Sequence, residues 1–345
     1  MINLPRVTSK KHFGLLLIVL PCGLILLILI SLCLGQYNMT PWTSAQILIT
    51  KIFHLPAGNW DPIAEKVILN LRLPRTLAAA AVGAALAVSG ATYQGIFRNP
   101  LVSPDFLGVS SGACIGAALA ILMGLNTTYI QGFAFIGGVI AVATTFSIPK
   151  MLKSDSNIML VLSGIIVGGL LGSIMGLLKY VADPETQLAT ITYWQMGSFA
   201  YVRFNDFLSV LPLMIFGFVV LFAMAWWIDI ISLGESEAHM LGANVKLIRG
   251  VAVFCATLLT ASAVCISGTI GWVGLVIPHF SRMLTGNENT KLLPIACFCG
   301  AIFMVLVDLC ARCLTTLELP ISILTGIIGA PFYAWILYKQ RTQLR

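Results

Sequence analysis

The longest polar interruption in the second half of the chain holds most of its candidate chemistry. It reads DIISLGESEAHMLGANVKLIRG and covers residues 229–250. Titratable side chains stand around two glycines in it: Asp229, Glu235, Glu237, His239, Lys246 and Arg249, with Gly234 and Gly242. Because glycine often ends a helix, we expect short helical pieces joined by turns. A compact segment of mixed charge between two apolar runs is typical of a docking site for a soluble partner, and a solvated loop is the alternative.

Patterns for nucleotide binding and metal binding are absent from the sequence. The chain has no G-x-x-x-x-G-K-[ST], so it is not expected to hold a nucleoside triphosphate in a phosphate-binding loop. Its four histidines, at positions 12, 54, 239 and 279, have no metal-ligand spacing. The nine cysteines lie almost all in apolar runs and are interpreted as small buried hydrophobic residues. If the protein moves a substrate, its energy is therefore expected to come from another subunit.

Composition indicates the class of protein that must position these residues. Of the 345 residues, 58% are hydrophobic and 10% are charged, and the mean hydropathy is +0.95. Soluble domains have about 25% charged residues. No alternation typical of a β-barrel is visible, and a backbone in lipid must satisfy its hydrogen bonds internally. We therefore predict an all-α integral membrane protein, with about ten transmembrane helices of about 20 residues each, in a single domain covering 1–345.

The spans and their orientation follow from the apolar runs and the basic residues. The expected spans are 13–35, 72–98, 106–125, 133–149, 158–178, 207–228, 251–267, 271–283, 292–309 and a last one that ends before Lys339. Thirteen of the twenty Lys and Arg fall on one set of connecting segments. The positive-inside rule then places in the cytoplasm the tail 1–12, the loop at about 229–249 and the tail 339–345.

Glycine recurs every fourth residue in the fifth expected span, at Gly164, Gly168, Gly172 and Gly176. This spacing gives one helix a face without side chains. Such a face is either a packing seam, which is the default in membrane helices, or the wall of a pathway.

Arg72, Arg75 and Arg312 are expected on the outer side, against the charge bias. Guanidinium groups bind carboxylates in a bidentate manner, so a partner with carboxylates is one explanation. Snorkelling of interfacial arginines toward water is the other.

Four stretches, in the same order, resemble the FecCD-type permeases of ABC importers. They are NLRLPRTLAAAAVGAALAVSGATYQGIFRNPLVSPDFLGVSSGA, GESEAHMLGANV, GTIGWVGLVIPHFSRMLTG and DLCARCLTTLELPISILTGIIGAPFYAWIL, and together they span about 70–337. The resemblance implies an ABC importer type II permease-like fold. That family handles ferric siderophores, haem and cobalamin. The expected function is the permease subunit of a binding-protein-dependent importer for an iron chelate such as a ferric siderophore, with haem, cobalamin or an oxyanion such as molybdate as alternatives.

The resemblance also implies partners. These are two cytoplasmic ABC ATPase subunits, an extracytoplasmic substrate-binding protein and a second permease subunit, in a homodimer or a paralogous heterodimer. The chain would contact membrane lipid and no nucleic acid. It would not be an enzyme and would bind no cofactor, because ATP and Mg would sit on the partner ATPase. The expected location is the plasma (inner) membrane of a prokaryote, with both termini cytoplasmic.

Roles for single residues come from the same resemblance. Coupling to the ATPase would fall on Gly234, Glu235, Glu237, Ala238, Leu241 and Gly242. Docking of the binding protein would fall on Arg72, Arg75 and Arg312. A cytoplasmic gate would comprise Asn99, Pro100, Leu101, Ser156, Asn157 and Ile158, and the helix with the four spaced glycines is similar to the pathway-lining helix.

Two classes outside this family stay open. An ion-coupled secondary transporter should show ionisable residues within its spans or broken helices at matching positions. A membrane enzyme should show a cluster of catalytic side chains. Neither pattern is visible in the sequence.

Overall fold

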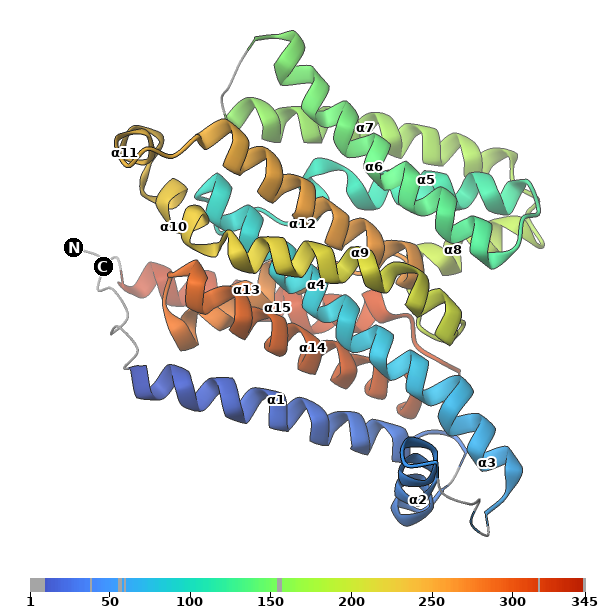
Figure 1. The fold of residues 1–345 in the computed structure, drawn as a ribbon. Coiled ribbons are helices and arrows are strands. Elements are labelled where there is room, and N and C mark those ends of the chain that lie inside the picture. Colours follow the sequence, from blue (N-terminus) through green and yellow to red (C-terminus); the bar gives the residue numbers. More distant parts are fainter. Residues whose placement is uncertain are drawn as a thin grey trace.

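The chain folds into a bundle of long helices that lie side by side (Figure 1). The computed structural model describes residues 10–37, 39–54, 58, 60–153, 157–315 and 317–343, and these residues form helices without strands. Seven helices of this described part are long and apolar enough to cross a membrane. The predicted all-α membrane fold is confirmed.

The long helices account for seven of the ten expected spans. They are α1 (Lys10–Cys33), α4 (Leu73–Phe97), α6 (Thr127–Met151), α7 (Asn157–Val181), α9 (Phe204–Ala223), α12 (Val245–Ser267) and α14 (Asn289–Cys313). The other three correspond to α5 (Val109–Leu122), α13 (Val273–Thr285) and α15 (Ile321–Gln343). The remaining helices are α2 (Pro41–Ile52), α3 (Pro62–Lys66), the π-helical turn η1 (Val67–Arg72), the 3-10 turn η2 (Pro104–Leu107), α8 (Gln187–Met196), α10 (Ala225–Leu233) and α11 (Glu235–Met240).

Helix α4 lies at the centre of the bundle and packs against α14, α12 and α13. Glycines permit this close packing. A Cβ on Gly83 would lie 2.1 Å from the carbonyl oxygen of Gly300, and a Cβ on Gly90 would lie 2.0 Å from the carbonyl oxygen of Gly274. Backbones that approach so closely leave no room for a side chain. This contact explains why the α4 sequence is rich in alanine and glycine.

Helices α5 and α13 are too short to cross the membrane alone. They have 14 and 13 residues, whereas a full crossing needs about 20. Each follows an irregular junction: η2 and Gly108 precede α5, and the segment 268–272 precedes α13. Gly108 has φ 81°, a conformation that glycine adopts without steric cost. Leu107 and Ile270 of these junctions are buried, so both junctions lie inside the bundle, where irregular backbone is tolerated if it lines a cavity.

Several helix ends differ from the expected boundaries, some by extension and some by shortening. In the segment expected at about 229–249, Asp229 lies in α10 and α12 already begins at Val245. Arg312 lies in α14, which continues to Cys313 and so passes the expected end of that span at 309. Ending a helix leaves backbone groups without partners, so helices continue into polar sequence beyond the apolar run. Apolar runs locate the hydrocarbon layer but do not locate helix ends.

The ends of the bundle differ in character. The first residue of α1 and the last turn of α15 lie at the same end as α11, whereas α2 and α3 lie at the opposite end (Figure 1). The expected tails 1–12 and 339–345 fall partly outside the described residues.

Candidate functional site

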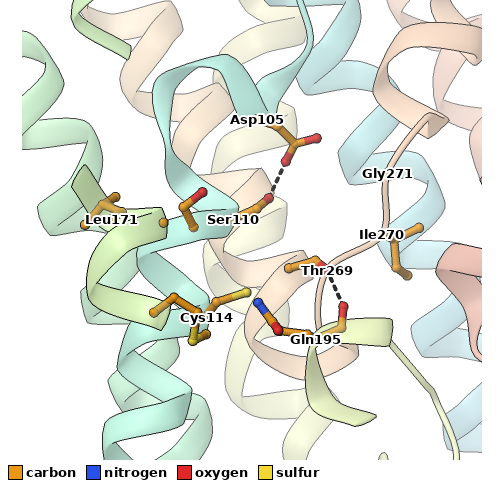
Figure 2. Close-up of a pocket in the computed structure, with 11 residues that line it drawn as sticks. Asp105, Ser110, Cys114, Leu171, Gln195, Thr269, Ile270 and Gly271 are labelled. Atoms are coloured by element: carbon orange, nitrogen blue, oxygen red, sulfur yellow. Dashed lines mark hydrogen bonds between the residues drawn. The ribbon is translucent and has the colours of Figure 1, made fainter. Parts of the chain in front are cut away.

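A cavity of about 460 Å³ opens where the two irregular junctions meet α7 and α8. Its lining comes from four parts of the chain (Figure 2). These are Asp105, Ser110, Ser111 and Cys114 around the start of α5, Leu171, Gly172 and Met175 of α7, Gln195 of α8, and Thr269, Ile270 and Gly271 before α13. Segments up to about 165 residues apart in sequence thus form one wall, which periodicity along a single helix does not reveal.

Polar groups in this cavity are already partly paired with one another. The Ser110 hydroxyl donates to the carboxylate of Asp105, and the Thr269 hydroxyl donates to the backbone carbonyl of Gln195 at 2.5 Å (Figure 2). Ser103 Oγ donates to the other carboxylate oxygen of Asp105 at 3.4 Å. The sequence interpretation passed over Asp105. The sequence did contain a signal for Asp105: it is a carboxylate directly before an expected span, where an ionisable residue is unfavourable and usually marks a functional site.

The four spaced glycines of α7 do not share one environment. A Cβ on Gly164 would lie 1.9 Å from the carbonyl oxygen of Phe106 in η2, so this glycine is a packing contact. Gly168, Gly172 and Gly176 have no atom within 4 Å of such a Cβ, and Gly172 lines the cavity. The packing explanation therefore applies to Gly164, whereas the other three glycines leave an open face. That the open face lines a pathway stays a prediction.

The segment expected to couple to a partner forms short helices joined by glycine turns, as predicted. Gly234 has φ 147° and Gly242 has φ 79°. Ala238 is buried among apolar residues of α10 and α12, which ties α11 to the bundle. Leu241, directly after α11, is 59% exposed. Helix α11 therefore presents apolar surface at one end of the bundle.

Charged residues of the same segment pair within the chain. Glu235 forms an ion pair with Arg249 of α12. The carboxylate of Asp229 accepts hydrogen bonds from the backbone N–H of Asn289 at 2.6 Å and from its side-chain amide at 2.8 Å. Asp229 of α10 thus satisfies the first backbone donors of α14, where a helix favours a negative charge. A force on α11 would act next to a helix that is fixed to the core of the bundle.

Arg72, Arg75 and Arg312 are not exposed, which corrects the geometry expected for them. The exposed fractions of the three residues are 5%, 8% and 5%, in that order. Arg75 donates from Nε to Asp308 at 2.8 Å and from an Nη atom to Glu318 at 2.7 Å. A buried guanidinium is stable only when acceptors surround it.

The other two arginines tie α1 to the same cluster. Arg72 donates to the carbonyls of Leu32 at 2.9 Å and Tyr37 at 2.7 Å. Arg312 donates to the carbonyl of Ser31 at 2.9 Å and to its hydroxyl. Nearby, the Tyr37 hydroxyl donates to Asp61 at 2.9 Å, and this hydrogen bond raises the pKa of the tyrosine. The three arginines hold together α1, α4 and α14 at the end of the bundle opposite α11; docking of a partner there stays a prediction.

The expected gate residues Asn99, Pro100 and Leu101 form the turn that follows α4. The backbone N–H of Leu101 donates to Asn99 Oδ1 at 2.9 Å, and Leu101 is 48% exposed. Ser156 lies outside the described residues. Asn157 and Ile158 begin α7, and their side chains are not among those described. The gate stays a prediction.

Comparison with known proteins agrees with this architecture. The model of the FecCD transport family matches residues 23–339. The molybdate import system permease protein MolB of Haemophilus influenzae is 40% identical over 97% of both chains. The probable iron chelatin transport system permease protein of Helicobacter pylori is 39% identical over 80% of this chain and 83% of that protein.

A solved structure has the same fold. It is an inward-facing conformation of a transporter that is provisionally assigned to the metal-chelate type of ABC transporter. The TM-score is 0.84 at 38% identity, over 94% of this chain and 99% of that one.

Proposed function

Because the chain belongs to the FecCD transport family and is an ABC importer permease, we propose that it moves an iron chelate, such as a ferric siderophore, inward across the membrane. The observation that carries this proposal is the cavity beside the open glycine face of α7. A face without side chains leaves room for a bulky ligand. The apolar Leu171 and Met175 beside polar groups suit the mixed surface of an organic chelate.

Energy would reach this chain from two cytoplasmic ABC ATPase subunits, with ATP and Mg bound there. We assign the contact to α11 and its flanking turns, with Gly234, Glu235, Glu237, Ala238, Leu241 and Gly242. The exposed Leu241 and the two positive-φ glycines support this assignment. The first residue of α1 and the last turn of α15 lie at the same end, which supports cytoplasmic termini in the plasma membrane of a prokaryote (Figure 1).

A second permease subunit would complete the pathway. On α7, the apolar Ile165, Ile166 and Leu170 are exposed beside the open glycines. In the membrane such a surface meets either lipid or another helix. A second subunit on this face, in a homodimer or a paralogous heterodimer, would enclose the glycine face between two chains. Asn99 to Leu101 and the start of α7 would close the pathway on the cytoplasmic side.

An extracytoplasmic binding protein would deliver the chelate to the opposite end of the bundle. The docking role of Arg72, Arg75 and Arg312 then requires that a carboxylate of the partner replaces one of their acceptors within the chain. Glu318 is the acceptor most open to exchange, because its side chain is 37% exposed while Asp308 is fully buried.

Molybdate is the second candidate substrate. It is favoured by the similarity to MolB, which extends over 97% of both chains. The two candidates differ in size and in charge, so transport measurements separate them.

The test is uptake by the complete importer. The permease would be reconstituted in proteoliposomes with its ATPase inside and its binding protein outside, and offered radioactive iron as a ferric hydroxamate chelate, haem, cobalamin or radioactive molybdate. We expect uptake of the iron chelate that depends on ATP. A vesicle preparation with an ATPase unable to hydrolyse ATP is the control. Uptake of molybdate alone would refute the iron chelate, and uptake driven by an ion gradient without ATP would refute the importer class.

A further inference from the structure

Helix α2 leaves three large apolar side chains exposed. Trp42, Ile49 and Phe53 are 71%, 50% and 67% exposed, in that order. The backbone N–H of Phe53 donates to the carbonyl of Ile49 at 2.9 Å, so Phe53 continues the last turn of the helix. At about 3.6 residues per turn, the three positions lie within about 40° of one another around the helix axis. They form one stripe along the helix, which we call the α2 apolar face.

The opposite side of α2 is fixed to the protein. Ile47 is fully buried and packs with Ala64 of α3 and Ile68 of η1. Lys51 forms an ion pair with Glu65 of α3 at 2.9 Å. These contacts determine how α2 is rotated about its axis, and they direct the α2 apolar face away from α3 and η1.

The depth of α2 in the membrane follows from α1. The candidate span in α1, His12–Cys33, has 22 residues and therefore rises about 33 Å, close to the thickness of the hydrocarbon layer, which is about 30 Å. Helix α2 begins at Pro41, soon after this span, contacts α1 and lies across its end (Figure 1). Helix α2 is therefore expected at the level of the lipid headgroups, where the hydrocarbon layer ends.

The neighbourhood of α2 is a surface that meets lipid. Helix α1 lies at one edge of the bundle and α7 at the opposite edge (Figure 1). The outward side chains of α1, among them Ile25, Leu26 and Leu29, are apolar and exposed, as in a helix that faces lipid. Leu34, directly after α1, continues this surface toward α2. The α2 apolar face has no charged side chain, because Lys51, the one charged residue of α2, lies on the other side.

The chemistry of α2 suits the boundary between headgroups and acyl chains. Tryptophan is enriched at this depth, because its ring is both apolar and able to donate a hydrogen bond. The side chain of Thr40 accepts a hydrogen bond from the backbone N–H of Thr43 at 3.2 Å, and Pro41 has no N–H to satisfy. The start of the helix therefore needs fewer partners from water. Amphipathic helices at a membrane surface bury their apolar face about 5–10 Å into this boundary.

We propose that α2 is an interfacial helix, whose apolar face of Trp42, Ile49 and Phe53 inserts into the membrane leaflet at the end of the bundle opposite α11. This is the outer leaflet in the orientation proposed above. The insertion holds α2, α3 and η1 at a fixed depth in the membrane. It is independent of the substrate that the permease moves.

Photo-crosslinking identifies what covers the α2 apolar face. p-Benzoylphenylalanine would replace Phe53 in one variant and Lys51 in a matched control, because Lys51 is exposed on the other side of the same helix. The complete importer, with its binding protein outside, would be irradiated in proteoliposomes of phosphatidylethanolamine and phosphatidylglycerol. Mass spectrometry would then identify the adduct at each position. We expect several-fold more lipid adduct at position 53 than at position 51.

Thiol reactivity gives an independent measurement on a second residue of the face. Ile49→Cys places a thiol on the α2 apolar face, and Lys51→Cys is its control. Both positions are exposed in the chain by itself, so the protein alone leaves both thiols open to water. In proteoliposomes, a sulfonated maleimide that does not cross membranes should modify position 51 several-fold faster than position 49, because lipid covers position 49. The two positions lie on the same side of the membrane, so the orientation of the permease in the vesicles does not change this ratio.

Two kinds of result would overturn the proposal. The first is an equal yield of lipid adduct at positions 51 and 53, or an equal rate of modification at positions 49 and 51, because lipid would then not distinguish the two sides of α2. The second is an adduct at position 53 with the binding protein or with a second permease chain in place of lipid, because it would assign the α2 apolar face to a protein partner.

Discussion

Adding one methyl group at two glycines of α7 should have opposite effects on the stability of the protein. A Cβ at Gly164 would lie 1.9 Å from the carbonyl oxygen of Phe106. Ordinary contacts need roughly 3.5 Å, so α7 and η2 would have to separate by more than about 1 Å. Overpacking of this kind costs about 1–3 kcal/mol. At Gly172 nothing lies within 4 Å, so alanine meets no clash there.

The expected difference between the two variants follows from these two environments. Alanine in place of glycine within a helix gains up to about 1 kcal/mol from backbone propensity. Gly172→Ala should keep this gain and be neutral or slightly stabilised. Gly164→Ala should lose more than it gains, so the two variants should differ by about 2 kcal/mol in free energy of unfolding. Both substitutions add the same atom to the same helix, which makes each the control for the other.

The difference in stability is measured by thermal unfolding of the purified permease, with the reactivity of buried cysteines as the probe of unfolding. Transport tests whether the open glycine face of α7 lines the pathway. Gly168→Leu or Gly172→Leu should block uptake and leave assembly with the ATPase intact, because the leucine side chain would fill the space at the open face. Equal melting temperatures for Gly164→Ala and Gly172→Ala would refute the assignment of Gly164 to a packing contact. Normal uptake by both leucine variants, or their failure to assemble, would refute the open face as a pathway wall.

Three further changes test the ends of the bundle. Gly242→Val should release the ATPase or uncouple ATP hydrolysis from uptake, because φ 79° costs a β-branched residue about 1–2 kcal/mol. Gly250→Val is the control and should do neither, since Gly250 also has no neighbours within 4 Å of an added Cβ but lies inside α12. Co-purification of the ATPase and ATP hydrolysis in proteoliposomes measure the two effects. Arg75→Leu should destabilise the permease by about 3–5 kcal/mol, because it removes an ion-pair partner of buried Asp308. Adding Asp308→Leu to this variant should restore much of the melting temperature. A double variant no more stable than the single one would contradict the pairing. Glu318→Gln should strengthen binding of the extracytoplasmic protein by up to about five-fold at low salt, as expected for a partly exposed ion pair, and unchanged affinity would argue against exchange of this acceptor.

Local and compositional properties were readable from the chain. A composition with 10% charged residues admits few alternatives to helices in lipid, because backbone groups in hydrocarbon have no other partner. The turns at Gly234 and Gly242 were expected, since glycine adopts positive φ at little cost and this property belongs to the residue itself. The alanines and glycines of α4 are likewise a local property, because small residues permit another backbone to approach closely.

Properties that depend on which surfaces meet could not be read in this way. Gly164 and Gly172 occupy the same face of α7, yet one touches η2 and the other faces a cavity. Arg75 and Asp308 pair across 233 positions, so an arginine that looked exposed at the mouth of a span became buried. Periodicity defines a helix and its faces, whereas the neighbour of each face is decided by the packing of all the helices together. That packing also brings Asp105 and Thr269 to one cavity, because two short helices start inside the bundle and leave their junctions side by side.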